Sequence, residues 1–364
     1  MLPENIKPLT ALRFFAAAWV VLFAFWPRLD IGFTPQIVSK GYLGVETFFI
    51  LSGFILSHVY LPAAEQGRFR YGSFLKARLA RIYPLHLICL AAIGVLGTLA
   101  VLAGREIDPN ILSMPSLVPN LLLVHAWGLA PVSGWNHPSW SISAEWFAYL
   151  AFPAFAWATI KLRRRPEAAL AGALVLVFAL NALFLKFAGF PLTKATYAWG
   201  ALRIVPCFAL GCALYLVWRS GAVQSRTAAL AGALFFGAAL ILGAQVDLPD
   251  PVLVVMAGGL ILFLAALSST GSKALSNPVL VYLGEISYSI YMVHTLWDLV
   301  FVNGVSSALH IEGKQLPLGI WLVLVAGVIP LASASYHFIE KPARERVRAW
   351  RLPALKRGIE ITPV

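Results

Sequence analysis

The stretch AALAGALFFGAALILG, residues 228–243, is apolar on every side of a helix. A helix that crosses the roughly 30 Å hydrocarbon core of a membrane needs about 20 mostly apolar residues, and runs of this kind recur along the chain. A transmembrane β-barrel would instead show segments of about ten residues with alternating polarity. The sequence therefore predicts an all-α fold, a polytopic membrane helical bundle.

The composition of the 364-residue chain excludes a soluble protein. Hydrophobic residues make up 60% and charged residues 12% of it, whereas soluble domains have about 45–50% apolar and about 25% charged residues. The net charge of +12 does not indicate a nucleic-acid partner, because the basic residues lie in short clusters between apolar runs. Cys89, Cys207 and Cys212 lie inside apolar runs without zinc-site spacing, so neither a metal site nor a disulfide framework is expected.

We expect about ten transmembrane helices and one shorter apolar segment. The segment 117–130 is only 14 residues long and contains Pro119 and His125, which favours a re-entrant or interfacial segment over a span. The ten spans are predicted at residues 11–27, 41–60, 82–104, 141–160, 168–187, 199–218, 226–245, 251–269, 279–303 and 317–338.

The lysine and arginine counts predict the orientation. With the N-terminus in the cytoplasm, 21 of the 28 basic residues lie on the cytoplasmic side, as the positive-inside rule requires. Both termini are thus expected in the cytoplasm, in a multi-pass protein of the inner (plasma) membrane. The chain divides into a transmembrane domain, residues 1–340, and a basic cytoplasmic tail, residues 341–364. The first apolar run is expected to be a membrane span and not a cleaved signal peptide, because a second span follows it directly.

Three arginines are candidates for binding an anion. Arg13 opens the first span, and position 24 lies on the same helix face about 16 Å along the axis; Ala24 stands there and has no group for catalysis. Arg78 and Arg81 are one helical turn apart, so their guanidinium groups can converge on a polyanion. The alternative interpretation is that all three anchor the helices at the membrane surface.

Acidic residues also fall inside predicted spans. Glu46 lies among aromatic residues, where a carboxylate is costly unless it is paired or protonated. Ser141 and Glu145 share one helix face, and a carboxyl group desolvated beside Trp140 would suit acid–base chemistry. Structural hydrogen bonds to neighbouring helices are the alternative for each of these residues.

A stripe of polar residues runs along one face of the ninth predicted span. Ser287, Tyr291, His294 and Asp298 are spaced by four, three and four residues, so they share a helix face that can line a cavity. A lone histidine such as His294 is also a common interhelical hydrogen-bond partner, and Glu340 is expected to pair with the basic tail. These residues alone leave two classes open: an enzyme, and a transporter or flippase of glycans or lipid-linked sugars.

Six motifs in succession over residues 9–344 resemble the membrane-bound acyltransferase-3 family. They are LTALRFFAAAWVVLF, GYLGVETFFILSGFI, FLKARLARIYPLH, HPSWSISAEWFAYLAFP, LGEISYSIYMVH and HFIEKPAR. The resemblance implies an O-acyltransferase that moves an acyl group, usually acetyl, from acyl-CoA to a hydroxyl. The implied acceptor is a sugar of a cell-surface or secreted glycan, or a macrolide or other small molecule in some members. Acetyl-CoA is implied as a substrate, with no permanently bound cofactor.

The resemblance also assigns roles to residues of this chain. Arg78 and Arg81 match an arginine motif that would hold the donor phosphates together with Arg13. The family's acidic motifs, which would orient the base or the acceptor, are matched by Glu46, Ser141 and Glu145. A histidine that recurs in a late helix of the family is matched by His294.

The first motif departs from the family at one position. The family pattern is arginine, ten residues and then histidine, with the histidine proposed as general base, whereas this chain has Ala24 at that position. The flanking residues are intact, which favours an engineered substitution over a divergent member with another base. This chain is therefore expected to be catalytically impaired.

Overall fold

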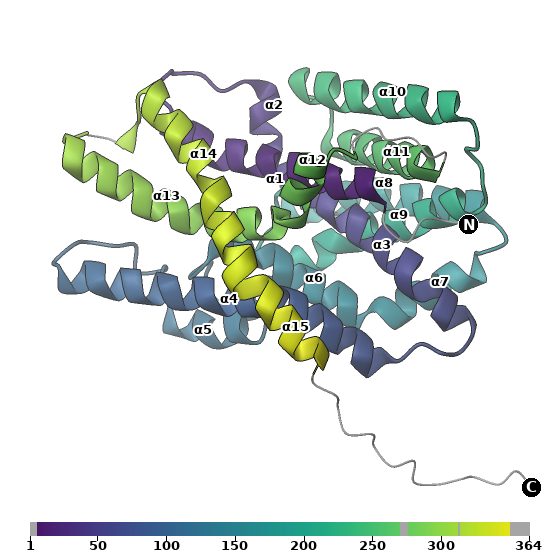
Figure 1. The fold of residues 1–364 in the computed structure, drawn as a ribbon, viewed down its shortest axis with the longest axis horizontal. Helices are drawn as coiled ribbons and strands as arrows, with labels where there is room; N and C mark the ends of the chain where they lie inside the picture. Colours follow the sequence, from purple (N-terminus) through teal and green to yellow (C-terminus); the bar gives the residue numbers. More distant parts are fainter. Residues whose placement is uncertain (1–5, 270–275, 312–313, 350–364) are drawn as a thin grey trace, which may run out of the picture.

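The computed structural model describes residues 6–269, 276–311 and 314–349. Over these residues the protein is a bundle of helices, with one isolated β-bridge between Leu29 and Leu316 (Figure 1). The predicted all-α membrane bundle is confirmed. The three cysteines are buried and free, and no group of three or more metal-ligating side chains occurs in the described part of the chain.

Eight helices of the described chain are long and apolar enough to cross a membrane. They are α1 (Lys7–Phe25), α3 (Gly44–Glu65), α4 (Tyr71–Leu102), α8 (Pro166–Ala188), α9 (Gly200–Arg219), α10 (Arg226–Gln245), α11 (Asp250–Ser269) and α14 (Leu318–Ser335). A ninth span is added if α12 (Pro278–Glu285) and α13 (Ser287–Leu309) count as one, with a 60° bend between them. The shorter helices are α2 (Gln36–Ser39), α5 (Met114–Leu121), α6 (Trp140–Leu150), α7 (Phe152–Lys161) and α15 (Lys341–Ala349).

The structure corrects the sequence prediction at three spans. The span predicted at 141–160 is not one helix but two short ones, α6 and α7. Pro153 lies in the first turn of α7, and its missing N–H and its ring prevent a continuous helix. The span predicted at 279–303 is bent, and α4 begins well before residue 82, which places Arg78 and Arg81 on a helix.

The segment 117–130, predicted to be too short to span, holds the second half of the short helix α5 and a single turn over residues 125–129. The described part of the predicted tail is α15, which continues from α14 and packs against α4 (Figure 1). Glu340 accepts hydrogen bonds from Ser289 and Arg344, so the predicted pairing of Glu340 with the tail is confirmed. Residues 350–364 lie outside the described residues.

Close packing of α3 against α9 depends on two glycines. A Cβ atom on Gly53 would lie 2.1 Å from the carbonyl oxygen of Phe208, and one on Gly211 would lie 2.1 Å from that of Ile50. Small residues of this kind let two membrane helices approach backbone to backbone. The contact fixes α9, which carries Arg203, relative to α3, which carries Glu46.

Buried histidines near the start of α6 predict a pH-dependent stability. His125 Nε2 lies 3.1 Å from the Ser139 hydroxyl, and its ring stacks on that of His86. Burial, and then the proximity of His86, lower the pKa of His125 from 6.5 to about 3. Below pH 6.5 the unfolded chain therefore binds a proton that the folded chain does not, so stability falls as the pH falls toward 3.

We expect the thermal unfolding midpoint to fall between neutral pH and about pH 4, and to fall less in His125→Asn. His310→Asn, at an exposed position, is the matched control and keeps the full decrease. An equal decrease in the parent protein and in His125→Asn would contradict this assignment.

Candidate active site

Three cavities follow one another along α1 and the antiparallel α3. The first, about 130 Å³, is lined by Ile6 and the first turns of α1, up to Arg13, and by α3. The second, about 100 Å³, shares Arg13, Leu51 and Ile55 with the first. The third, about 500 Å³, is lined by Ala24 near the end of α1. We call the second the arginine cavity and the third the Ala24 cavity.

The arginine cavity brings together all three predicted donor-binding residues. Arg13, Arg78 and Arg81 all line it, with Glu145 as the acidic residue among its lining side chains. Three guanidinium groups and one carboxylate leave a formal excess of two positive charges in a partly enclosed space. Such a site suits a polyanion, because arginine binds phosphate oxygens in a bidentate manner.

Arg78 has an unused hydrogen-bond donor in this cavity. Its Nη2 donates to the Tyr60 hydroxyl at 3.2 Å, and its guanidinium group lies 5.6 Å from the centroid of the same ring. Its Nε is buried and has no hydrogen-bond partner among the described residues. A buried donor without a partner costs about 1–3 kcal/mol, so an anionic ligand that reached Nε would relieve that cost.

Ser141 and Glu145 line the same cavity, as their spacing predicts. Glu145 accepts a hydrogen bond from Ser52 of α3, and the Ser141 hydroxyl donates to the carbonyl oxygen of Pro138 at 3.1 Å. Glu145 therefore lies with the arginines, whereas Ala24 lines the next cavity.

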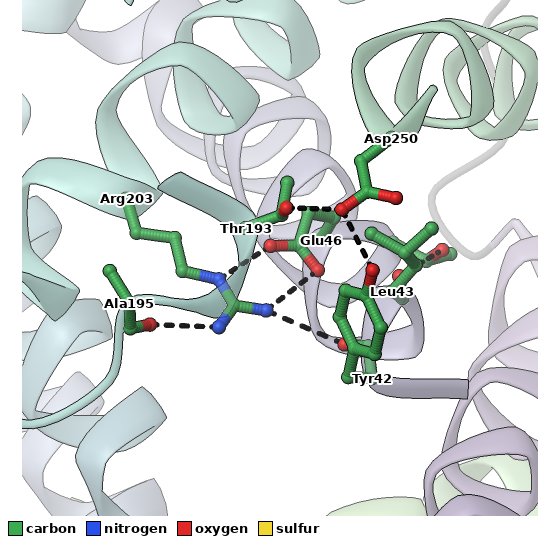
Figure 2. A network of polar contacts seen from close by, with 8 residues as sticks. Tyr42, Leu43, Glu46, Thr193, Ala195, Arg203 and Asp250 are labelled. Atoms are coloured by element: carbon green, nitrogen blue, oxygen red, sulfur yellow. Dashed lines mark hydrogen bonds and ion pairs between the residues drawn. The ribbon is translucent and has the colours of Figure 1, made fainter. Parts of the chain in front are cut away.

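Glu46 is held by an arginine that the sequence reasoning missed (Figure 2). Arg203 donates to both Glu46 carboxylate oxygens, from Nε at 2.5 Å and from Nη2 at 3.0 Å, and the two residues are only 3% and 1% exposed. The Arg203 guanidinium also lies 4.5 Å from the Trp140 ring centroid. An arginine inside a predicted span was the available signal. Because Arg203 occupies both oxygens, Glu46 is a structural ion-pair partner in this structure.

A second polar group lies beside this pair (Figure 2). Asp250 accepts hydrogen bonds from Tyr42 at 2.8 Å, from Lys40 at 2.8 Å and from Thr193. These contacts join the start of α11 to the segment that precedes α3. They hold one wall of the Ala24 cavity, which Tyr42, Thr193 and Arg203 line.

His294 lines the Ala24 cavity, and its hydrogen bonds determine which ring nitrogen carries the hydrogen. Its Nδ1 lies 2.6 Å from the carbonyl oxygen of Tyr291, and a carbonyl oxygen can only accept, so Nδ1 carries the hydrogen. Nε2, 3.3 Å from the Thr295 hydroxyl, is left as the acceptor atom. Of the polar stripe on α13, Tyr291 and His294 line this cavity, while Asp298 forms an ion pair with Arg28.

The fold, the arginine cavity and the Ala24 cavity define a polytopic membrane protein with a partly buried cationic site beside a cavity lined by aromatic and polar side chains. Residues 7–337 match the family model described as "Acyltransferase domain", which covers nearly the whole chain. The chain belongs to this family, the acyltransferase-3 family, and its relatives support a membrane O-acyltransferase.

Two relatives illustrate the similarity. "Acyltransferase MdmB" of Streptomyces mycarofaciens is 32% identical over 319 residues, which cover 80% of this chain and 78% of that protein. "Putative O-acetyltransferase SACOL0978" of Staphylococcus aureus (strain COL) is 26% identical over 350 residues, 87% of this chain and 55% of that protein. The chain thus spans about half the length of the staphylococcal relative. No solved structure gives a significant match.

Proposed function

We propose that the protein is an acyl-CoA-dependent O-acyltransferase of the inner (plasma) membrane, and that its acceptor is a sugar hydroxyl of a cell-surface or secreted glycan. The convergence of Arg13, Arg78 and Arg81 in one cavity, which shares the lining residues Val45 and Tyr291 with the Ala24 cavity, carries this proposal. The similarity to "Acyltransferase MdmB" and to "Putative O-acetyltransferase SACOL0978" supports the reaction class.

The donor fits the order of the cavities. Its phosphates would bind the three arginines on the side predicted to be cytoplasmic, as charge-assisted hydrogen bonds to guanidinium groups favour. Its pantetheine arm would carry the thioester toward Val45 and Tyr291, the two residues that line both the arginine cavity and the Ala24 cavity. Acetyl is the acyl group that we propose for transfer.

The acceptor fits the Ala24 cavity. The rings of Phe23, Tyr42 and Trp140 lie there with polar groups of Lys194 and His294. Large apolar surfaces with a few convergent polar groups are typical of small-molecule sites, and a sugar offers both apolar ring faces and hydroxyls. His294 Nε2 can accept a hydrogen bond from a sugar hydroxyl and orient it.

In the transfer step, the acceptor oxygen forms a bond to the thioester carbonyl carbon and the carbon–sulfur bond breaks. A base at position 24 would take the hydroxyl proton and return it to the coenzyme A thiolate that leaves. Ala24 has no atom that can take this proton. We therefore propose that this chain binds its donor but transfers the acyl group slowly.

Binding of labelled acetyl-CoA to the purified chain tests the proposed donor. We expect Arg78→Gln and Arg81→Gln each to weaken binding roughly 10- to 150-fold, the loss that follows when a hydrogen bond to a charged group is removed. Arg219→Gln is the matched control, because Arg219 pairs with Glu65 and lines neither cavity. Absence of acetyl-CoA binding by the parent chain would contradict the proposal and favour a transporter or flippase.

A further inference from the structure

Val45 and Tyr291 form a partition between two cavities. They are the two residues shared by the linings of the arginine cavity and the Ala24 cavity. Both side chains are buried. Any group that passes from one cavity to the other, or reacts between them, therefore lies against these two side chains.

Tyr291 is held in place on several sides. Its hydroxyl donates to the carbonyl oxygen of Pro138 at 3.0 Å, and the Ser141 hydroxyl donates to the same oxygen. Its ring centroid lies 5.7 Å from that of His294 and 6.3 Å from that of Phe48. The ring can move aside only if the hydroxyl loses its acceptor.

Val45 is held by the contact between α1 and α3. The preceding residue, Gly44, lies so close to α1 that a Cβ atom there would be 2.4 Å from the carbonyl oxygen of Ala16. The first turn of α3 therefore cannot approach α1 further. Val45 and Tyr291 together form two fixed walls, one aliphatic and one aromatic.

We propose that Val45 and Tyr291 select the donor by the length of its acyl group, admitting acetyl and disfavouring longer chains. This inference rests on the proposed function, in which the thioester approaches from the arginine cavity and the hydroxyl from the Ala24 cavity. The two reactants meet at the partition, so the acyl substituent packs against Val45. The arginine cavity, at about 100 Å³, leaves little space for a longer chain to fold back.

The test compares the binding of acetyl-CoA and butyryl-CoA to the full chain in detergent. The chain with Ala24 suits this measurement because slow transfer leaves the thioester intact. One methylene in an apolar pocket changes discrimination by roughly 10- to 200-fold, so we expect the parent to bind butyryl-CoA at least about tenfold more weakly than acetyl-CoA. Val45→Ala should reduce this ratio at least about tenfold, and Val45→Ile should increase it.

Val20→Ala is the matched control. Val20 is buried, lines the Ala24 cavity and lies outside the lining of the arginine cavity, so the same truncation should leave the ratio unchanged. An unchanged ratio in both Val45 variants, or an equal shift in Val20→Ala, would overturn the inference and leave the proposed function intact. Absence of binding by both CoA esters to the parent would instead contradict the proposed function itself.

Discussion

Ala24→His is expected to raise the rate of acyl transfer by roughly 10²–10⁴-fold, the range typical of general acid–base catalysis. The new imidazole would lie in the same cavity as His294 and would supply the missing proton acceptor. The change adds no group to the arginine cavity, so the affinity for acetyl-CoA should stay within about threefold of that of the parent. A change of this size is far smaller than the loss of affinity expected when a hydrogen bond to a charged group is removed. Transfer of labelled acetyl from acetyl-CoA to glycan in membranes measures the effect.

Ala24→Gln is the control for bulk and polarity at the same position. An amide side chain fills similar space but is not a base, so we expect no comparable gain in rate. The rate of Ala24→His should rise with pH through the titration of the imidazole, near about 6.5 for an unperturbed group, while that of Ala24→Gln should not. If Ala24→His gains nothing and His294→Asn abolishes the parent's transfer, then His294 is the base and Ala24 marks a divergent member.

Arg203→Met is expected to lower the free energy of unfolding by about 3–5 kcal/mol, the cost of leaving one partner of a buried ion pair without the other. Glu46 would then be a buried carboxylate that has lost both hydrogen bonds from Arg203. The same substitution removes the guanidinium that stacks on Trp140, so the start of α6 should also loosen. Denaturant or thermal unfolding of the purified protein in detergent measures the loss.

The double variant Arg203→Met with Glu46→Leu distinguishes an unpaired charge from simple loss of packing. Replacing both partners of a buried pair by apolar residues of similar size is often neutral, so most of the lost stability should return. Arg28→Met, which breaks the more exposed pair with Asp298, should cost less than Arg203→Met. Equal destabilisation by the single and double variants would show that the ion pair is not the cause.

The sequence predicted the bundle because apolar runs of membrane-spanning length require helices whatever their packing. It did not predict the break between α6 and α7, since a proline in a membrane helix, here Pro153, can either kink the helix or end it. It also did not predict the bend between α12 and α13. Local patterns define a segment, whereas the contacts between segments decide whether it stays straight.

The candidate site was predicted only in part, because spacing along one helix is visible in the sequence and contacts between helices are not. Arg78, Arg81, Ser141 and Glu145 are close in sequence on single helices, so helical periodicity was enough to group them within each pair. The approach of Arg13 to those pairs, the pairing of Glu46 with Arg203, and the separation of Glu145 from Ala24 depend on contacts between distant helices. No helical spacing contains that information.

The proposed reaction moves an acyl group from acyl-CoA to a sugar hydroxyl of a glycan. Mass spectrometry of surface glycans tests it most directly, on cells that express the Ala24→His chain and on cells that lack the gene. We predict O-acetyl groups on sugar hydroxyls in the first set, absent from the second, and lost again when Arg78 and Arg81 are both replaced by glutamine. Identical glycans in all three sets, with both expressed proteins present in the membrane, would contradict the proposed reaction.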